Sequence, residues 1–320
     1  MKTKRLLPRF RLLILAALCA LRAASGATAE KLVIFSQCNN AEPYRAAQNQ
    51  RMAELWAAVP GARLEIMDAQ QDNARQIAQI ETAILRRPAL LIVAPNESAP
   101  LTRVMGRALR ATIPVICLER DISQPFYTSY VRADNREIGR LAGEYIVELL
   151  KKKNGAPRGI IVELCGLKGV EAEINREGGA HDVWKNYPDI KVAANPVADW
   201  LQSRGKDRMT EVLSALPRID IVYGHNDPMA MGAWLAAKDK GREKEMLFVG
   251  VDGLPGPGGG IEKVREGLLA ATFVYPLCVD EAVEIGAKIL ADKTWSPPKT
   301  VTVKSRMVTQ ASLPPPTAEK

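Results

Sequence analysis

The sequence lacks the short motifs that identify several large enzyme classes. It contains no G-x-S-x-G, no H-E-x-x-H and no Walker phosphate loop. It has only two histidines: His225 follows a predicted strand and could face a cleft, whereas His181 is expected on a helix, far from it along the chain. Two such residues are not expected to form a metal set. We predict that the chain is not an enzyme and that it has neither a cofactor nor a metal site.

A long membrane-spanning run is also missing. The apolar stretch from Leu12 to Leu21 is well short of the roughly 20 residues that cross a bilayer. It follows a basic start and precedes the small-x-small site Ala27-Thr28-Ala29, an order typical of a cleavable secretory signal. We predict that residues 1–29 are removed and that the mature chain, starting at Glu30, is periplasmic. An uncleaved membrane anchor is the alternative.

Without this segment the chain has little excess charge. The whole sequence has 44 Lys and Arg against 36 Asp and Glu, and six of the basic residues lie in residues 1–29. The mature chain therefore carries 38 minus 36, or +2. A basic surface for nucleic acid is not indicated, and we predict no nucleic-acid partner.

Cysteine is scarce and widely spaced. Four of the five remain after cleavage, namely Cys38, Cys117, Cys165 and Cys278, and they match no zinc pattern. Cys117 lies in an apolar, strand-like run, where a buried thiol behaves as a small hydrophobic group. We expect free thiols, although an even count in an oxidising compartment also permits disulfides.

What the sequence does contain is a regular alternation of short apolar runs and longer amphipathic segments. Strands are predicted at Leu32–Phe35, Arg63–Met67, Leu90–Ala94, Pro114–Leu118, Gly159–Leu164, Lys191–Ala194, Ile219–Tyr223, Leu247–Val251 and Ala270–Val274. Among the helices between them, one is capped by Asp72 and runs to about Arg86, and another runs from about Arg136 to Lys152 and stops at Asn154-Gly155. The pattern predicts an α/β fold with two parallel sheets in two Rossmann-like lobes.

Polar residues gather just beyond the predicted strands, where open parallel sheets bind ligands. They are Ser36-Gln37, Asp68, Asn96-Glu97, Glu119-Arg120, His225-Asn226-Asp227, Asp252-Gly253 and Tyr275. Carboxylates, amides and guanidinium groups hydrogen-bond neighbouring hydroxyls, and aromatic faces pack on the C–H face of a sugar ring. The set favours a polyol ligand. A glycosidase pair among Glu119, Asp227 and Asp252 is the weaker alternative.

The glycine-rich stretch Gly253–Gly260 looks at first like a phosphate cradle. It lacks the Lys and the Ser or Thr of such a loop, and its prolines remove amide donors. We expect a mobile surface loop ahead of a helix that starts near Ile261.

From Leu32 to Val303 the chain resembles the periplasmic sugar-binding proteins of ABC transporters, in the ribose- and galactofuranose-binding-like group of type I solute-binding proteins. The resemblance is carried by DAQQDNARQIAQIE (68–81), IPVICLERD (113–121), RADNREIGRLAGEYI (132–146), VELCGLKG (162–169), GHNDPMAMGA (224–233), VGVDGLPG (249–256) and EGLLAATF (266–273).

The resemblance implies a set of ligand contacts. By motif they are Ser36, Gln37, Asn40, Tyr44, Arg45, Glu119, Arg120, Arg176, Trp200, Asn226, Asp252 and Tyr275. Eight of them have a structural alternative: Tyr44 and Trp200 as packing between lobes, Arg45 as a solvated charge, Arg176 paired with a neighbouring glutamate, Asn226 and Asp252 as helix caps, and Glu119 with Arg120 as a mutual ion pair. Ala94 stands where ribose binders have a ligand Asn, which disfavours simple ribose.

The resemblance also implies the topology and the partners. The N-terminal lobe is expected at 30–132 plus 276–303 and the C-terminal lobe at 133–275 plus 304–320, with a hinge near Ala133, Tyr275 and Lys304. A monomer that passes a sugar to an ABC permease is expected, or one that reports it to a membrane sensor. A repressor of similar core would need DNA-binding helices where this chain has its export signal.

Overall fold

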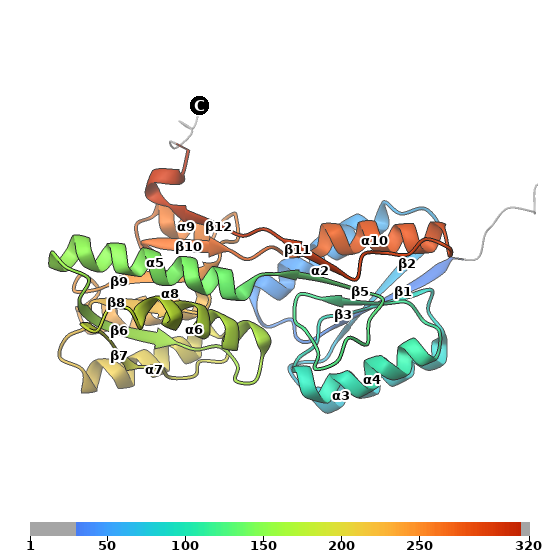
Figure 1. Cartoon of the computed structure of the whole chain (residues 1–320), viewed down its shortest axis with the longest axis horizontal. Helices are drawn as coiled ribbons and strands as arrows, with labels where there is room; N and C mark the ends of the chain where they lie inside the picture. The colour runs from blue at the N-terminus through green and yellow to red at the C-terminus, as the bar shows by residue number, and fades with distance from the viewer. Residues whose placement is uncertain (1–29, 315–320) are drawn as a thin grey trace, which may run out of the picture.

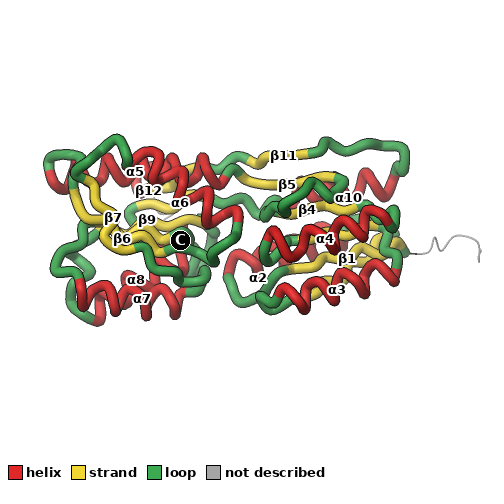
Figure 2. The backbone as a smooth tube through the Cα atoms, turned by 60° about the horizontal axis from the view of Figure 1, so that its bottom comes forward, coloured by secondary structure: helices red, strands yellow, loops and turns green. Residues whose placement is uncertain are grey.

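The computed structural model describes residues 30–314, so the predicted export signal at 1–29 lies outside the described residues. Two α/β lobes lie side by side along the long axis of the molecule (Figure 1). Each lobe has one six-stranded sheet with helices on both faces (Figure 2). The predicted fold class, two lobes with parallel sheets, is confirmed.

The first sheet belongs to the N-terminal lobe and has the order β11-β5-β4-β3-β1-β2, with every pair parallel. Its strands are β1 (Lys31–Gln37), β2 (Ala62–Asp68), β3 (Leu90–Val93), β4 (Val115–Leu118), β5 (Ser129–Ala133) and β11 (Thr300–Val303). One face packs against α2 (Pro43–Ala57) and α10 (Val279–Ala291), and the other against α3 (Asn73–Arg86) and α4 (Ser98–Arg110).

The second sheet has the order β12-β10-β9-β8-β6-β7, and only β12 runs antiparallel to its neighbour. Its strands are β6 (Gly159–Leu164), β7 (Ile190–Ala194), β8 (Ile221–Gly224), β9 (Leu247–Asp252), β10 (Ala271–Val274) and β12 (Arg306–Thr309). Helices α5 (Asn135–Asn154) and α6 (Glu171–Trp184) cover one face, whereas α7 (Gln202–Ala215), α8 (Asp227–Asp239) and α9 (Gly260–Arg265) cover the other. The short 3-10 helix η1 (Gln310–Ser312) follows β12.

Local sequence signals account for the helix limits. The carboxylate of Asp72 accepts a hydrogen bond from the amide of Arg75 and caps α3, as predicted. Helix α5 ends at Gly155, which adopts the left-handed conformation that glycine tolerates best. Both predicted boundaries are confirmed.

Three strands escaped prediction: β5, β11 and β12. The last two are edge strands, TVTV and RMVT, with several exposed residues and no apolar run longer than two residues. We predicted nine strands, and the described part of the chain has twelve. An edge strand needs no continuous apolar run, because one side of it faces no neighbour.

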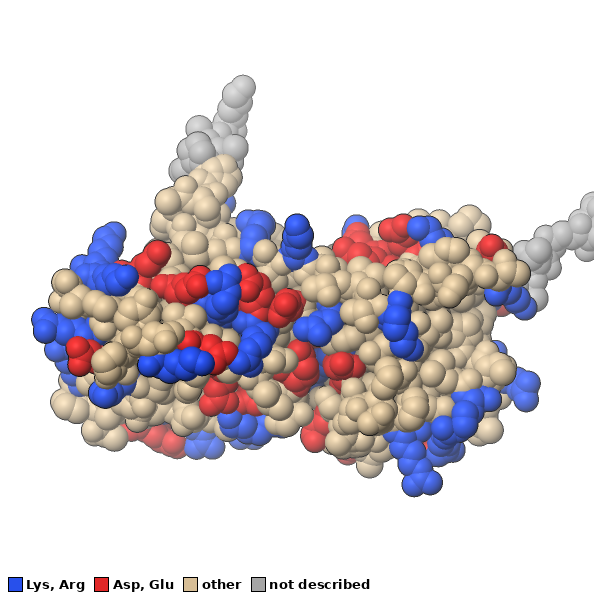
Figure 3. Space-filling view, in the orientation of Figure 1, with Lys and Arg blue, Asp and Glu red and all other residues tan. Residues whose placement is uncertain are grey.

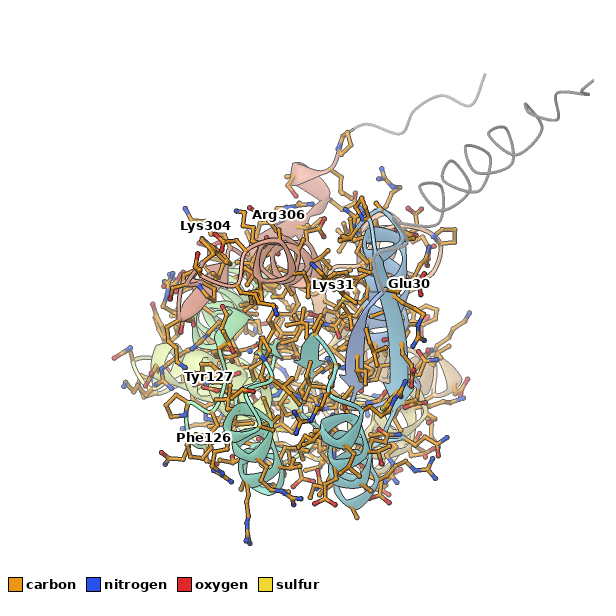
Figure 4. All side chains as sticks on the ribbon, turned by 90° about the vertical axis from the view of Figure 1, so that its right-hand side faces the viewer. Glu30, Lys31, Phe126, Tyr127, Lys304 and Arg306 are labelled. Atoms are coloured by element: carbon orange, nitrogen blue, oxygen red, sulfur yellow. The ribbon has the colours of Figure 1, made fainter. Side chains whose placement is uncertain are left out.

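The chain passes between the lobes three times. The passages follow β5, β10 and β11, and they lie beside the residues at which the resemblance puts the hinge, Ala133, Tyr275 and Lys304. Figure 4 labels Lys304, on the third passage, and Arg306, the first residue of β12, and both are exposed. The passages bring the carboxyl ends of both sets of parallel strands to face each other.

Among residues 30–314 we find no helix with the length and apolar character needed to span a membrane.

The four cysteines of this part of the chain are free and buried, as expected. Burial raises the pKa of each of these thiols, which disfavours the reactive thiolate.

We predict that the native mature chain reacts only slowly with a thiol reagent such as dithionitrobenzoate, and that four thiols react at once in denaturant. A reductant should leave the melting temperature unchanged, because no disulfide supports the fold. Two thiols in denaturant, with four only after reduction, would contradict the free-thiol structure.

Candidate functional site

A small cavity lies between the two lobes, at the carboxyl ends of the strands. Its lining includes nine of the twelve predicted ligand contacts: Tyr44, Arg45, Glu119, Arg120, Arg176, Trp200, Asn226, Asp252 and Tyr275. Glu42 and Ala172 also line it and were not predicted. The space left among these side chains is about 10 Å³, room for roughly one water molecule. The lobes are therefore closed, and their own side chains fill the space between them.

Larger hollows lie elsewhere, but they lack this concentration of buried charge. One of about 670 Å³ lies at the opposite ends of the N-lobe strands, beside Lys31 and Trp295. Another of about 490 Å³ lies at the cleft rim, beside Trp234 and the loop at 254–260. On the molecular face in Figure 3, acidic and basic side chains are mixed over the surface. The interlobe cavity is thus singled out by its chemistry and not by its size.

Glu119, which follows β4, is the centre of the buried charges. Its Oε2 lies 2.6 Å from Nη1 of Arg45 and 3.8 Å from Nε of Arg120, and its Oε1 accepts a 2.5 Å hydrogen bond from the hydroxyl of Tyr275. Burial would raise the pKa of Glu119, but the two arginines and the hydrogen bonds together lower it. Glu119 is therefore ionised, and its main partner is Arg45, not the neighbouring Arg120.

Aromatic rings and guanidinium planes form layers around this carboxylate. The rings of Tyr44 and Tyr275 stack with centroids 5.0 Å apart and an interplanar angle of 22°. The guanidinium of Arg176 lies 4.3 Å from the ring centre of Tyr275 and 5.5 Å from that of Trp200. The guanidinium of Arg120 lies 5.8 Å from Trp200. Such stacking fixes the orientation of the aromatic faces in the cavity wall.

Arg176 on α6 is held by amide and carbonyl oxygens. Its Nε donates to Oδ1 of Asn135 at 3.0 Å, and its Nη1 donates to the carbonyl of His225 at 2.5 Å. The alternative that it pairs with Glu173 or Glu177 is wrong, because those carboxylates contact Lys168. The arginine charge therefore stays at the cavity.

Asp252 ends β9 with its carboxylate in the cavity wall. Among the described residues its side chain accepts no hydrogen bond, although it is only 5% exposed, and its φ of 123° is unusual for a residue with a side chain. Neighbouring Asp227 accepts hydrogen bonds from Thr272 and from the amide of Gly253. Burial raises the pKa of Asp227 to about 7, and burial plus the charge of Asp227 raises the pKa of Asp252.

Asn226 uses both of its polar atoms within the protein. Its Oδ1 accepts from the amide of Met229 and caps α8, and its Nδ2 donates to the carbonyl of Trp200 at 2.9 Å. The alternative that Asn226 caps the following helix is therefore correct for its hydrogen bonds. Asn226 fixes the position of Trp200 as well as lining the cavity.

Three donors in the cavity wall are buried without a hydrogen-bond partner among residues 30–314. They are Nε of Arg45, Nε of Arg120 and Nε1 of Trp200. An unpaired buried donor costs about 1–3 kcal/mol, so proteins rarely keep several together without a purpose. A bound ligand with acceptor oxygens would satisfy them.

The other three predicted contacts do not reach the cavity. The side chain of Ser36 accepts from Gln76, Gln37 donates to Gln48 and Asn49, and Asn40 is exposed and accepts from Asn49. These bonds shape the loop ahead of α2, which presents Tyr44 and Arg45. Ser36, Gln37 and Asn40 are therefore not part of the cavity lining.

Of the two missed residues, Glu42 had a usable signal, because it is an acid next to Tyr44 and Arg45 in the same loop. Its Oε1 accepts a 2.7 Å hydrogen bond from Asn39. Ala172 has no polar atom in its side chain and gave no signal. The two histidines, which are far apart along the chain, both contact Glu163, and no signal in the sequence pointed to this meeting.

Comparison with known proteins agrees with this geometry. Residues 33–288 match the family described as periplasmic binding protein domain. A galactofuranose-binding protein of Escherichia coli is 33% identical over 253 residues, covering 77% of this chain and 78% of the relative. A ribose import binding protein of Salmonella typhimurium is 31% identical over 232 residues, covering 72% and 75%.

Solved structures give the same picture. The fructose-binding periplasmic domain of a hybrid two-component system superimposes with a TM-score of 0.83 at 36% identity, covering 88% of this chain and 92% of that one. A galactofuranose-binding protein gives 0.81 at 29% identity, covering 88% and 95%. Homologues of this kind are solute-binding proteins without enzymatic activity, in agreement with the prediction that the chain is not an enzyme. The family match, the relatives and the two-lobed fold agree, and the chain belongs to the periplasmic binding protein domain family.

Proposed function

We propose that the chain is a periplasmic sugar-binding protein of an ABC importer and that it encloses one monosaccharide between its lobes. The observation that carries this proposal is the interlobe cavity, in which buried unpaired donors, an acceptor carboxylate and aromatic faces meet at the strand ends. A sugar needs all three kinds of contact at once, because its ring has polar edges and an apolar face.

Each group has a separate part in this proposal. Sugar oxygens accept from Nε of Arg45 and Nε of Arg120, and a sugar hydroxyl donates to Asp252. The ring packs against Trp200 and the stacked Tyr44. Glu119 keeps both arginines in position through its buried ion pairs.

The lobes must open before a sugar can enter. The remaining space of about 10 Å³ is far smaller than a sugar ring. The three passages between the lobes are the places at which the backbone can rotate. Since the contacts come from both lobes, the ligand binds the closed form more tightly than the open form and shifts the equilibrium toward closure.

The relatives suggest the class of sugar. They are named for galactofuranose, ribose and fructose, and further structural neighbours are described with arabinofuranose and fucofuranose. Glu119 and Tyr275 stand where ribose binders, by resemblance, have a shorter acid and a glutamine. These differences favour a galactofuranose-type ligand over ribose.

The proposal includes export by a cleaved signal at residues 1–29, a monomeric state and delivery to an ABC permease. The likeness to the periplasmic domain of a hybrid two-component system favours a second candidate, a receptor whose closure is read by a membrane sensor. Adjacent genes for a permease and an ATPase would support import, whereas an adjacent lone sensor kinase gene would support signalling.

Calorimetry of the mature chain against a panel of pentoses, hexoses, furanoses and polyols tests the proposal. We expect one sugar to bind at one site per chain, with a furanose or a related monosaccharide as the tightest ligand. No binding across the whole panel would contradict the function.

Trp200→Ala and Asp252→Ala should each weaken sugar binding about ten- to a hundredfold, because each removes a ring contact or a charge-assisted hydrogen bond worth roughly 1.5–3 kcal/mol. Trp295→Ala and Asp239→Ala, both away from the cavity, are matched controls and should keep the affinity of the parent chain. Equal affinity in the parent and both cavity variants would show that the ligand binds elsewhere.

Without ligand, the Asp227–Asp252 pair should make stability depend on pH. Both folded-state pKa values lie above the unfolded value of about 4, so the pair contributes stability below pH 4 that is lost as the pH rises toward the folded-state values, about 7 for Asp227. Asp252→Asn removes one buried charge, so its melting temperature relative to the parent should rise by at least about 3 °C between pH 4.5 and pH 7.5. A constant difference over this range would contradict the shifted pKa values.

A further inference from the structure

The only two histidines of the chain meet at one buried carboxylate, beneath the interlobe cavity. Nε2 of His181 lies 2.7 Å from Oε2 of Glu163, and Nε2 of His225 lies 3.0 Å from Oε1 of the same side chain. Glu163 and His225 are fully buried. The residues are 62 positions apart at most, and the fold brings them together because β6 pairs with β8 and α6 packs on the same face.

Further metal-binding side chains surround this carboxylate. Cys165 lies two residues beyond Glu163, on the same side of an extended segment. On α6, Glu173, Glu177 and His181 are spaced four residues apart and therefore share one helix face. Three sets have ligand atoms within 4.8 Å of one another: Glu163, Cys165 and His225; Glu163, Glu177 and His181; and Cys165, Glu173 and Glu177.

The cluster has a negative net charge that a bound cation would balance. Three carboxylates, Glu163, Glu173 and Glu177, face one ammonium, that of Lys168, which contacts Glu173 and lies 3.3 Å from Glu177. With neutral imidazoles the cluster therefore carries a net charge of −2, which matches a divalent ion. The side chain of Lys168 is 50% exposed, so it can turn toward solvent when an ion takes its place.

One of the three sets is open to solvent. The side chains of His181 and Glu177 are 41% and 26% exposed, whereas Glu163 closes the inner side. An ion can therefore enter past α6 without unfolding the lobe.

The buried Nδ1 of His225 has no hydrogen-bond partner among the described residues, an unusual state for a buried imidazole inside such a cluster.

We propose that Glu163, Glu177 and His181 form a binding site for a divalent transition-metal ion of the zinc class, with Cys165 and His225 beside it. One imidazole and two carboxylates leave a fourth position for water or for the thiolate of Cys165. The His225 ring holds the second oxygen of Glu163, as outer groups commonly do for metal ligands. Imidazole and thiol donors favour zinc over calcium or magnesium.

A bound ion would tie α6 to β6. Arg176 lies on the same helix, between Glu173 and Glu177, and it contacts the backbone of His225. The metal site therefore stiffens the support of the cavity arginine, but it does not require that the cavity bind a sugar.

Zinc titration of the mature chain, made without a histidine tag and stripped with chelator, tests the site. We expect one saturable zinc ion per chain and a higher melting temperature with zinc. His181→Gln and Glu177→Gln should each weaken zinc binding at least about tenfold, and both side chains are exposed enough for the variants to fold.

Two comparisons complete the test. Asp182→Asn changes an exposed acid next to His181 and should leave zinc affinity unchanged. Lys168→Gln removes the competing ammonium and should tighten binding. The proposal is overturned if the parent chain shows no saturable zinc binding, or if folded His181→Gln and Glu177→Gln bind zinc as tightly as the parent.

Discussion

Glu119 places an ionised carboxylate among side chains that exclude water, and the cavity is arranged around that constraint. A lone buried charge would be very costly, so Arg45 and Tyr275 must stay within hydrogen-bonding distance of it. Arg45 comes from α2, Glu119 follows β4, and Tyr275 lies in the second passage between the lobes. One carboxylate thus links the N-lobe to the connection across which the lobes would move.

The ion pair between Glu119 and Arg45 explains why the cavity is closed and yet able to bind a ligand. The ion pair uses Nη1 of Arg45 and leaves its Nε unpaired, and Arg120 keeps an unpaired Nε as well. On the C-lobe, the carboxylate of Asp252 accepts no hydrogen bond from the described part of the chain. The unmet hydrogen bonds are therefore shared between the two lobes, and a small polar molecule with donors and acceptors can satisfy both sides together.

Much of the fold follows from sequence because buried parallel strands and capped helices leave strong local signals. The run LLIV of β3 and the Asp72 cap are examples. The edge strands β11 and β12 gave no such signal, since half of their residues are polar and the strands are held in place by pairing with β5 and β10, which are not adjacent to them in sequence. The residues within such a strand do not identify it, because the strand forms only when it pairs with its neighbour in the sheet.

The site shows the same division. Topology rules place Glu119, Asp252 and Tyr275 at one edge, and the structure brings them to one cavity. The positions of Ser36 and Gln37 depend on which neighbours take their hydrogen bonds, and sequence does not contain that information. The meeting of His181 and His225 at Glu163 was missed for a related reason, because a helix face and two strands must first be docked.

A crystal structure of the mature chain with the tightest-binding sugar of the panel would show whether the ligand occupies the interlobe cavity. We expect a sugar ring between the lobes, packed on Trp200, with its oxygens near Nε of Arg45, Nε of Arg120 and the carboxylate of Asp252. A sugar bound outside this cavity, with Arg45 and Glu119 still closed on each other and no ligand between the lobes, would contradict it.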